Sequence, residues 1–400
     1  MSVIMLLLAV IITLAAVLSG KCPEGREKLW YSSALLISAG AIGAFISTDL
    51  FFFFAFHELA LIPTFLMIGI LGRGDRKEVA WKTTIYLAFG SIILLAGLIM
   101  VGKETGYDMR NLSPLAAENQ VTAALLLIIG FGTLVSLFPF HSWAAPAYAS
   151  APAPVSMLHA GVLKKFGLYG LIRVGLEAAP EGMKHWLVLL LVLLVCNIIW
   201  VGLITINQKR VDLMLGNSSV MHMGYIFLAI AALVDNGSSF AMQAAVLLMF
   251  AHGISIAMSF CLADRIEAKT GSLELNQLGG LAKAAPTLAF LFGLVGMASI
   301  GLPGLANFAG EIMVFFSGFE GWEPADGLGA VQIATIIAIW GVVISAVYML
   351  RAFRHIFQGD TSSRTEDATD LGVCEKIPAI LLAVILLVVG IYPNSILQFL

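Results

Sequence analysis

Five ionisable side chains lie inside stretches of the sequence that are otherwise apolar enough to cross a membrane. Glu58 follows the run FFFFAFH, and Glu311 lies in LANFAGEIMVFF. Lys164 and Lys165 interrupt SMLHAGVLKKFGLYGL, and His252 lies in LLMFAHGISIAM. An ionisable group near the bilayer centre costs roughly 2.5 to 3.5 kcal/mol on insertion scales, so such groups usually mark a path for ions or protons. Because each of these groups can bind and release a proton, the pattern favours proton translocation.

The composition indicates an integral membrane protein. Hydrophobic residues make up 60% of the 400 residues, charged residues make up 12%, and the mean hydropathy is +0.95. Soluble domains average about 25% charged residues. The net charge of -3 and the lack of a basic block argue against a nucleic-acid partner. The four cysteines are scattered singly, so neither a metal site nor a disulfide framework is predicted.

Apolar segments of membrane-spanning length recur along the whole chain and predict an all-α protein with about twelve transmembrane helices. They lie near 3–20, 31–48, 50–71, 83–102, 121–139, 154–174, 186–206, 214–234, 239–262, 284–317, 327–350 and 378–398. The 284–317 segment is too long for one straight span, and Gly301, Pro303 and Gly304 weaken helix in its middle. We therefore expect two half-helices there, an arrangement that is typical of transport sites.

The basic residues are distributed unevenly between the two sides of the predicted bundle. One side collects Lys21, Arg26, Lys28, Arg73, Arg76, Lys77, Lys82, Lys209, Arg210, Arg265, Lys269, Lys283, Arg351, Arg354, Arg364 and Lys376. The other side has Lys103, Arg110, Arg173 and Lys184. The positive-inside rule then places the basic loops in the cytoplasm and both termini on the opposite face. The expected location is the bacterial inner (cell) membrane or an equivalent energy-coupling membrane.

Six motifs, taken in order, resemble those of a known family. They are STDLFFFFAFHELALIP, FPFHSW, GVLKKFGLYGLIR, SSVMHMGYIFL, MFAHGIS and GLPGLANFAGE, and the similarity continues to the terminal VVGIYPNSIL. Together they resemble the antiporter-like, proton-translocating membrane subunits of respiratory complex I, of the chain M type, which are related to Mrp cation/proton antiporters. The resemblance implies two inverted five-helix repeats, each with a broken helix. It divides the chain into an N-terminal helix and loop at 1–30, repeats at 31–175 and 186–351, and a loop and C-terminal helix at 352–400.

The resemblance also implies a role for five residues in a relay across the middle of the membrane. Glu58 falls on a glutamate that pairs with a lysine and modulates its proton affinity, and Lys165 falls on a central lysine. His222 and His252 fall on relay histidines. Glu311 falls on the terminal ionisable group, where sister subunits have a lysine. Coupling between Glu58 and Lys165 is the expected switch, because an opposite charge nearby changes the proton affinity of a buried group.

Neighbouring polar residues leave several alternatives open. His159 and Lys164 are further candidates for the relay, although Lys164 lies about 100° around the helix from Lys165, where another subunit could contact it. By the same geometry, His57 is expected to point away from Glu58. Asp49 is expected to cap the helix that follows it.

The sequence departs from the family pattern in its first half. The lysine that the resemblance implies seven residues before the histidine of FPFHSW is replaced by Leu134, and Ser136 stands where a proline often breaks the helix. Either Lys164 or a water chain through Gly130 and Gly132 is a candidate substitute. The segment 3–20 resembles the family's third helix, so a shortened or split subunit is expected.

The leading hypothesis is a proton-translocating subunit of an NADH:quinone oxidoreductase. The resemblance implies that this chain binds no cofactor itself, and that NADH, FMN, iron-sulfur clusters and quinone bind to partner subunits. The implied partners are other membrane subunits, including neighbouring antiporter-like ones, and the lipid bilayer. An Mrp-type Na⁺/H⁺ antiporter subunit is the alternative, and a structural subunit with a partly lost relay is a third reading, favoured by Leu134.

Overall fold

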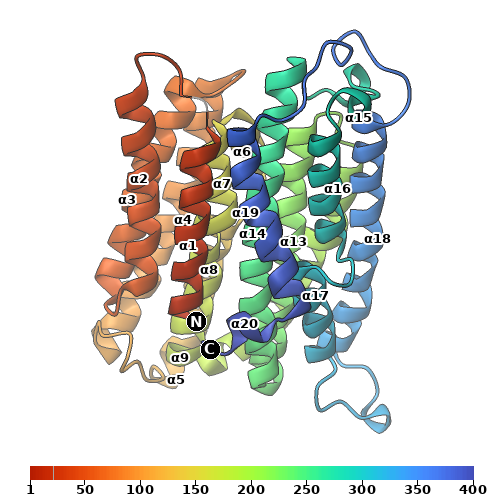
Figure 1. Cartoon of the computed structure of the whole chain (residues 1–400). Helices are drawn as coiled ribbons and strands as arrows, with labels where there is room; N and C mark the ends of the chain where they lie inside the picture. The colour runs from red at the N-terminus through yellow and green to blue at the C-terminus, as the bar shows by residue number, and fades with distance from the viewer. Residues whose placement is uncertain (21) are drawn as a thin grey trace.

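A computed structural model describes residues 1–20 and 22–400, so Lys21, one of the basic residues above, lies outside the described residues. The chain is a bundle of helices packed side by side (Figure 1). The α-helices are α1 (Ser2–Ser19), α2 (Glu27–Ile46), α3 (Leu50–Leu71), α4 (Arg76–Thr105), α5 (Ala117–Val135), α6 (Ala144–Ser150), α7 (Ala153–Leu158), α8 (Lys165–Gly170), α9 (Leu176–Ala178), α10 (Pro180–His185), α11 (Leu187–Val195), α12 (Gly202–Ile206), α13 (Val211–Asn236), α14 (Ser239–Thr270), α15 (Leu281–Ala284), α16 (Pro286–Ile300), α17 (Ala306–Ser317), α18 (Ala330–Phe357), α19 (Val373–Ile391) and α20 (Asn394–Leu397).

Twelve crossings of the bundle can be traced in the described part of the chain, as the sequence predicts. Ten are helices, or runs of joined helices, that are long and apolar enough to span a membrane. Another is the continuous helical run 153–178, in which two π-helical segments, His159–Leu163 and Leu171–Gly175, interrupt the α-helix. The last consists of the half-helices α16 and α17. The protein is therefore an all-α, multi-pass membrane protein.

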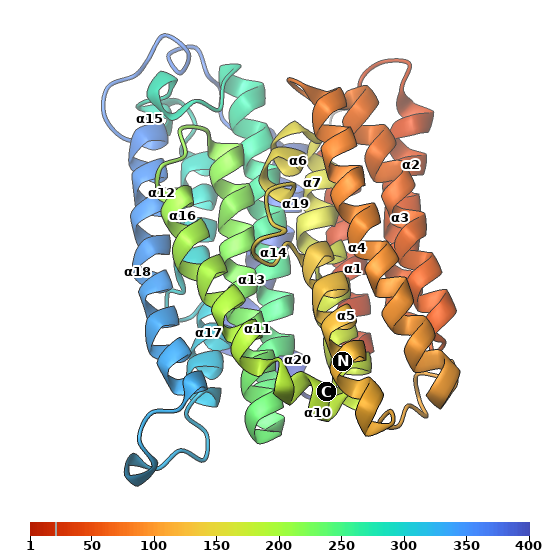
Figure 2. The same cartoon turned by 180° about the vertical axis from the view of Figure 1, so that it is seen from behind.

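Two of the crossings are broken, and they run in opposite directions. Helix α16 ends at Ile300, the chain turns through Gly301 (φ 83°) and Gly304 (φ 91°), and α17 resumes at Ala306, as predicted. In the first half, α5 starts at the face that carries the termini, and α6 continues to the other face (Figures 1 and 2). The broken helix that the resemblance implied for the first half is therefore present, but the span predicted at 121–139 ends too early, because the crossing extends to Ser150.

A buried asparagine supports the break between α5 and α6. Ser136 has φ 70°, an unusual value for a residue other than glycine, and it ends α5 at Val135. Asn197 accepts a hydrogen bond from the Phe138 N–H at 2.6 Å and donates to the carbonyls of Ser136 at 3.3 Å and Val220 at 3.1 Å. Backbone groups that a broken helix frees at membrane depth need such partners. The support comes from a distant residue, so the local sequence does not reveal it.

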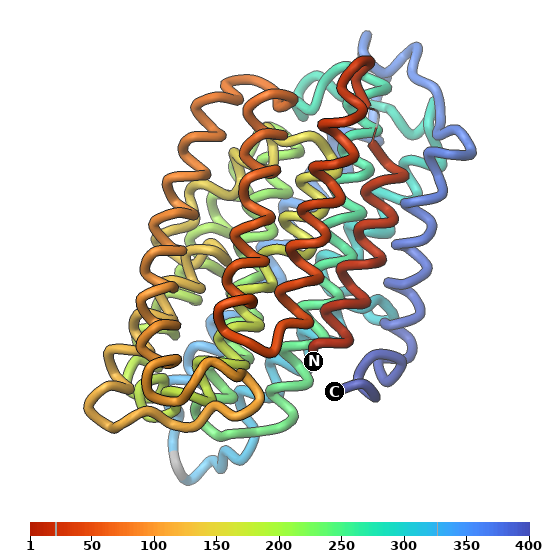
Figure 3. The backbone as a smooth tube through the Cα atoms, turned by 90° about the vertical axis from the view of Figure 1, so that its left-hand side faces the viewer, coloured from red at the N-terminus to blue at the C-terminus, as the bar shows by residue number. Residues whose placement is uncertain are grey.

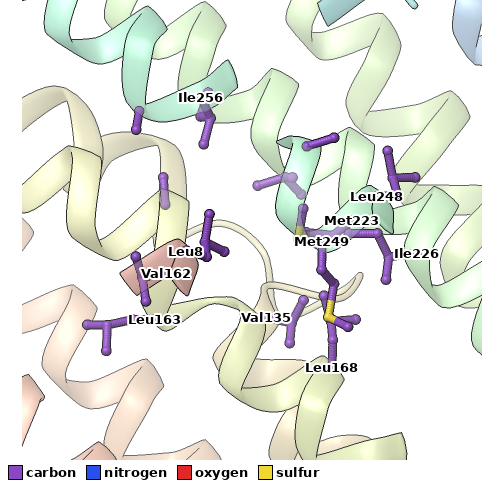
Figure 4. Packing of buried hydrophobic residues seen from close by; sticks show 14 of the residues in the cluster. Leu8, Val135, Val162, Leu163, Leu168, Met223, Ile226, Leu248, Met249 and Ile256 are labelled. Atoms are coloured by element: carbon purple, nitrogen blue, oxygen red, sulfur yellow. The ribbon is translucent and has the colours of Figure 1, made fainter. Parts of the chain in front are cut away.

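Helices α13 and α14 form the centre of the bundle. In the most apolar 18-residue window of α14 every residue is buried, and in that of α13 89% are buried, against 39% for α3 and α18. Figure 4 shows Met223 of α13 and Met249 of α14 beside Leu168, within the continuous buried apolar cluster. Figure 3 shows α19 running beside α1 on one side of the bundle. The central helices therefore hold their polar side chains away from lipid.

Three loops that carry basic residues lie on the face opposite the termini. The connections 72–75, 207–210 and 358–372, which hold Arg73, Lys209, Arg210 and Arg364, lie at the end away from the N- and C-termini (Figure 1). We call this end the basic face.

The Asp49 side chain accepts hydrogen bonds from the backbone N–H groups of Phe51 at 2.8 Å and Phe52 at 3.2 Å, which confirms it as the cap of α3.

Asp370, in the loop before α19, caps the start of α16 across space. Its carboxylate accepts hydrogen bonds from the N–H groups of Thr287 at 3.1 Å and Leu288 at 3.2 Å. Burial opposes ionisation of Asp370, but the hydrogen bonds from Thr287, Leu371 and Leu288 outweigh it and lower the pKa of the carboxyl. The charged form also interacts favourably with the helix N-terminus. Asp370 therefore ties the long loop to the first half of the broken crossing.

Replacing Asp370 with alanine is expected to lower the free energy of unfolding by about 1 kcal/mol. Because the folded-state pKa lies below the unfolded value, this stabilisation is present above about pH 4 and is lost as the pH falls through the lowered folded pKa. Thermal unfolding of the chain in lipid nanodiscs, near neutral pH and in acid, measures both effects. Asp367→Ala, an exposed change in the same loop, is the control. An equal loss in that control, or a difference that does not change with pH, would contradict the assignment.

Candidate functional site

Lys165 and His252 meet where two helices approach backbone to backbone. Lys165 Nζ lies 3.0 Å from His252 Nδ1 and donates a hydrogen bond to the Ala160 carbonyl at 2.7 Å. Both side chains are buried, and Lys165 has no exposed surface. A Cβ atom added at Gly253 would lie 2.7 Å from the Gly161 carbonyl oxygen, so only glycine permits this approach. The structure therefore brings together two of the residues that the resemblance assigned to the relay.

His222 connects His252 to Glu311. The rings of His222 and His252 have centroids 5.6 Å apart, and His222 Nε2 lies 3.8 Å from Glu311 Oε1. His222 Nδ1 also lies 2.8 Å from the Ser218 carbonyl oxygen, and Nε2 lies 3.0 Å from that of Ser299. A carbonyl only accepts hydrogen bonds, so only the doubly protonated ring can donate to both. The site can therefore hold a doubly protonated His222 ring beside a carboxylate.

The break in the second broken crossing surrounds the Glu311 carboxyl group. The left-handed turn at Gly301 favours glycine for its φ of 83°, and a Cβ atom there would lie 2.5 Å from Glu311 Oε2 and so would displace the carboxyl group. Glu311 is buried, and its Oε1 has no hydrogen-bond partner in the described part of the chain. A buried polar atom without a partner costs free energy, and proteins retain such atoms where function requires them.

Glu58 lies at the other end of the molecule, and its contacts differ from the expected ones. Its side chain is 34% exposed; Oε1 accepts a hydrogen bond from Ser91 Oγ at 2.6 Å and lies 3.3 Å from His57 Nδ1. The expectation that His57 points away is wrong, because its ring is buried against Phe166, with centroids 4.0 Å apart, while Nδ1 still reaches Glu58. Lys165 contacts His252 and Ala160 instead of Glu58.

Lys164 and His159 lie inside the chain, beside Tyr148. Lys164 has no exposed surface, so the expectation that another subunit contacts it is wrong. Its Nζ lies 3.3 Å from Ser219 Oγ and 5.5 Å from the centre of the Tyr148 ring. His159 Nδ1 lies 3.4 Å from the Tyr148 hydroxyl. The structure therefore places these two candidates next to the relay rather than in its line.

Leu134 and the two glycines near it are packing positions. Leu134 is buried in the apolar cluster. A Cβ atom would lie 2.7 Å from the backbone of Leu94 at Gly130, and 3.0 Å from the side chain of Leu137 at Gly132. Because neighbouring atoms fill the space at both glycines, the structure offers little room there for the water chain that the sequence left open. Of the two candidate substitutes for the lysine that is missing at Leu134, the structure therefore favours Lys164 over the water chain.

Comparison with known proteins identifies the class that this fold and site define. The family model described as NADH:quinone oxidoreductase/Mrp antiporter, transmembrane, matches residues 47–338. The chain belongs to this family. It is 38% identical over 369 residues to an NAD(P)H-quinone oxidoreductase chain 4 of Microcystis aeruginosa, covering 90% of this chain and 65% of that relative. It is 34% identical to a chain 4 of a Picosynechococcus species, covering 98% of this chain and 74% of the relative. This chain thus spans about two thirds to three quarters of the length of these relatives.

Solved structures agree with this assignment. A chain of respiratory complex I from Thermus thermophilus superposes with a TM-score of 0.85 at 27% identity, covering 99% of this chain and 80% of that one. A chain of the Mrp complex from a Dietzia species has a TM-score of 0.87 at 21% identity, covering 99% and 81%, which shows the shared fold. The resemblance inferred from the six motifs is therefore confirmed.

Sequence reasoning missed several polar residues at the site. Tyr148 and Ser91 come from other helices than the residues they contact, with 11 and 33 residues between the partners along the chain. Asn307 donates to Ser255 Oγ at 3.2 Å, and Ser218 pairs with the Tyr348 hydroxyl at 2.6 Å beside His222. Serine, tyrosine and asparagine are common packing residues in membrane helices. Their types alone give no signal, and only the tertiary contacts reveal them.

Proposed function

We propose that this chain is a proton-translocating membrane subunit of a complex I-like NADH:quinone oxidoreductase. The observation that supports this most strongly is the line of buried titratable side chains Lys165, His252, His222 and Glu311, in which each member lies close to the next. Membership of the family supports the same assignment. The chain itself carries out no redox step, and partner subunits bind NADH, FMN, the iron-sulfur clusters and quinone.

The relay works by passing one proton between neighbouring groups. A Lys165 ammonium gives its proton to His252 Nδ1, 3.0 Å away, and the imidazolium passes it to His222, whose ring centre lies 5.6 Å from that of His252. His222, with carbonyl oxygens at both nitrogens, holds the proton beside the Glu311 carboxylate, which then accepts it. Changes elsewhere in the assembly drive this transfer. In this proposal the membrane is the bacterial inner membrane, with the basic face in the cytoplasm, and the partners include neighbouring antiporter-like subunits.

Purification through an affinity tag on this chain tests the assignment. We expect flavin- and iron-sulfur-containing subunits to copurify, and the complex reconstituted in vesicles to couple NADH oxidation to proton uptake. Isolation without such subunits, together with sodium-dependent proton exchange in an antiporter-deficient host, would overturn the proposal in favour of an antiporter.

A further inference from the structure

Lys164 is a buried lysine that the line of four relay residues does not use. Neither Lys164 nor Lys165 has a carboxylate within ion-pair distance among the described residues, and the two are adjacent in sequence. Two unpaired ammonium groups in a dry interior are very unfavourable. At least one of the two amines is therefore neutral at a given moment and free to accept a proton.

Tyr148 and His159 connect Lys164 to the basic face. Tyr148 contacts both of the other groups: Lys164 Nζ lies over the face of its ring, 5.5 Å from the ring centre, and His159 Nδ1 lies 3.4 Å from its hydroxyl. The His159 ring is buried, and its Nε2 has no hydrogen-bond partner in the described part of the chain. An unpartnered buried nitrogen of this kind suits a group that binds a proton or a water transiently.

A small cavity at the basic face is lined in part by Tyr148. Its lining includes Arg73, Tyr148, Ser156, Asp212 and Asp264, and its volume open to water is about 10 Å³. A space of that size admits about one water molecule. Asp212 pairs with Arg210 at 2.7 Å and Asp264 pairs with Arg73 at 3.0 Å, so charged groups at the loops surround the cavity. The cavity gives water at the basic face a route to Tyr148.

Ser219 connects Lys164 to the relay at its other end. The hydroxyl accepts from Lys164 Nζ at 3.3 Å, and Ser219 stands three residues before His222 on α13. On a helix, residues three apart lie on the same side. Lys164 thus lies between the cavity at the basic face and the relay.

We propose that Tyr148, His159 and Lys164 form a side branch through which the relay exchanges protons with water at the basic face. The proposal rests on the proposed function of the relay. In each exchange, a hydronium ion at the cavity gives up a proton and becomes water, the neutral amine of Lys164 takes up a proton by way of Tyr148 and His159, and the ammonium passes it on to Lys165, where it enters the line of four. No bond other than the N–H and O–H bonds is made or broken, and the proton count is unchanged. Lys164 thereby takes the place of the lysine that is missing at Leu134.

Proton uptake driven by NADH in vesicles that carry the whole assembly tests the branch. We expect Lys164→Met to reduce the share of uptake that passes through this subunit at least about tenfold, because it removes a positioned proton acceptor. Tyr148→Phe removes one hydroxyl and should reduce uptake severalfold, with a larger solvent isotope effect than the unmodified assembly. Tyr169→Phe is the matched control, because that hydroxyl bonds Ser2 at 2.8 Å, away from the branch. Proton uptake in Tyr169→Phe should equal that of the unmodified assembly.

The outcomes separate the branch from the relay. If Lys164→Met and Tyr148→Phe take up protons normally while Lys165→Met does not, the branch is wrong and the relay stands. If Lys165→Met also takes up protons normally, the proposed function itself fails, and the branch fails with it. If Lys164→Met does not assemble, as judged by native gel, Tyr148→Phe against Tyr169→Phe decides alone: equal uptake in these two would overturn the branch.

Discussion

Replacing Lys165 with methionine is expected to stop proton translocation by this subunit while the chain still folds. Loss of a positioned proton donor and acceptor typically reduces rates by about a hundredfold or more. Methionine fills a similar volume, but it leaves the Ala160 carbonyl and His252 Nδ1 without their partner, at about 1–3 kcal/mol. Proton uptake in reconstituted vesicles, with NADH oxidation recorded in parallel, measures the effect.

Lys165→Arg separates proton transfer from fixed charge at this position. Arginine keeps a positive charge, but it does not give up its proton in proteins. A relay therefore fails with arginine as it does with methionine, whereas a structural cation that holds helices together tolerates arginine. Normal proton uptake in Lys165→Arg would show that Lys165 does not have to exchange a proton.

Glu311→Gln is expected to have an effect of similar size. Glutamine has nearly the same shape and still fits beside Gly301, but it cannot accept the proton from His222, whose Nε2 is 3.8 Å from the carboxyl oxygen. Glu311→Asp keeps a titratable group and draws it back from His222, so intermediate uptake is expected. Proton uptake per electron transferred is the measurement. If proton uptake in Glu311→Asp is no higher than in Glu311→Gln, the Glu311 carboxyl group only packs against the break in the helix.

The double variant Lys165→Met/Glu311→Gln tests whether the two groups act in one line. Groups that work in series give a double variant no worse than the more damaged single one, whereas independent paths give effects that multiply. We expect proton uptake in the double variant to equal that of the lower single variant. A multiplied loss would mean that Lys165 and Glu311 serve separate routes.

The sequence predicts the crossings and the second broken helix because the signals for them are local. Apolar runs define the spans, and Gly301 and Gly304 adopt positive φ angles that only glycine takes easily. The break after Val135 lacks such a signal. The break lies at Ser136 and is stabilised by Asn197, about sixty residues away, which donates a hydrogen bond to the Ser136 carbonyl and accepts one from the Phe138 N–H. Conformations that depend on a distant partner cannot be predicted from helix propensity.

The same distinction applies to the site. Lys165, His252 and Glu311 were identified because an ionisable side chain in an apolar run is unusual in itself, whereas His222 came from the family resemblance. The lysine partner expected for Glu58 came from the family resemblance, and His57 was set aside because neighbours in a helix were assumed to diverge by about 100°. The imidazole of His57 is long enough to stay buried against Phe166 and still reach the carboxylate. Side-chain reach and packing, which the sequence does not encode locally, decided this contact.

Infrared difference spectroscopy of the purified assembly during turnover tests the central proposal most directly. The carboxylic acid C=O stretch reports whether Glu311 gains and loses a proton. The account predicts a band that changes with turnover, disappears in Glu311→Gln, and stays constant in Lys165→Met because no proton arrives. A Glu311 band that never changes, or one that changes equally in Lys165→Met, would contradict it.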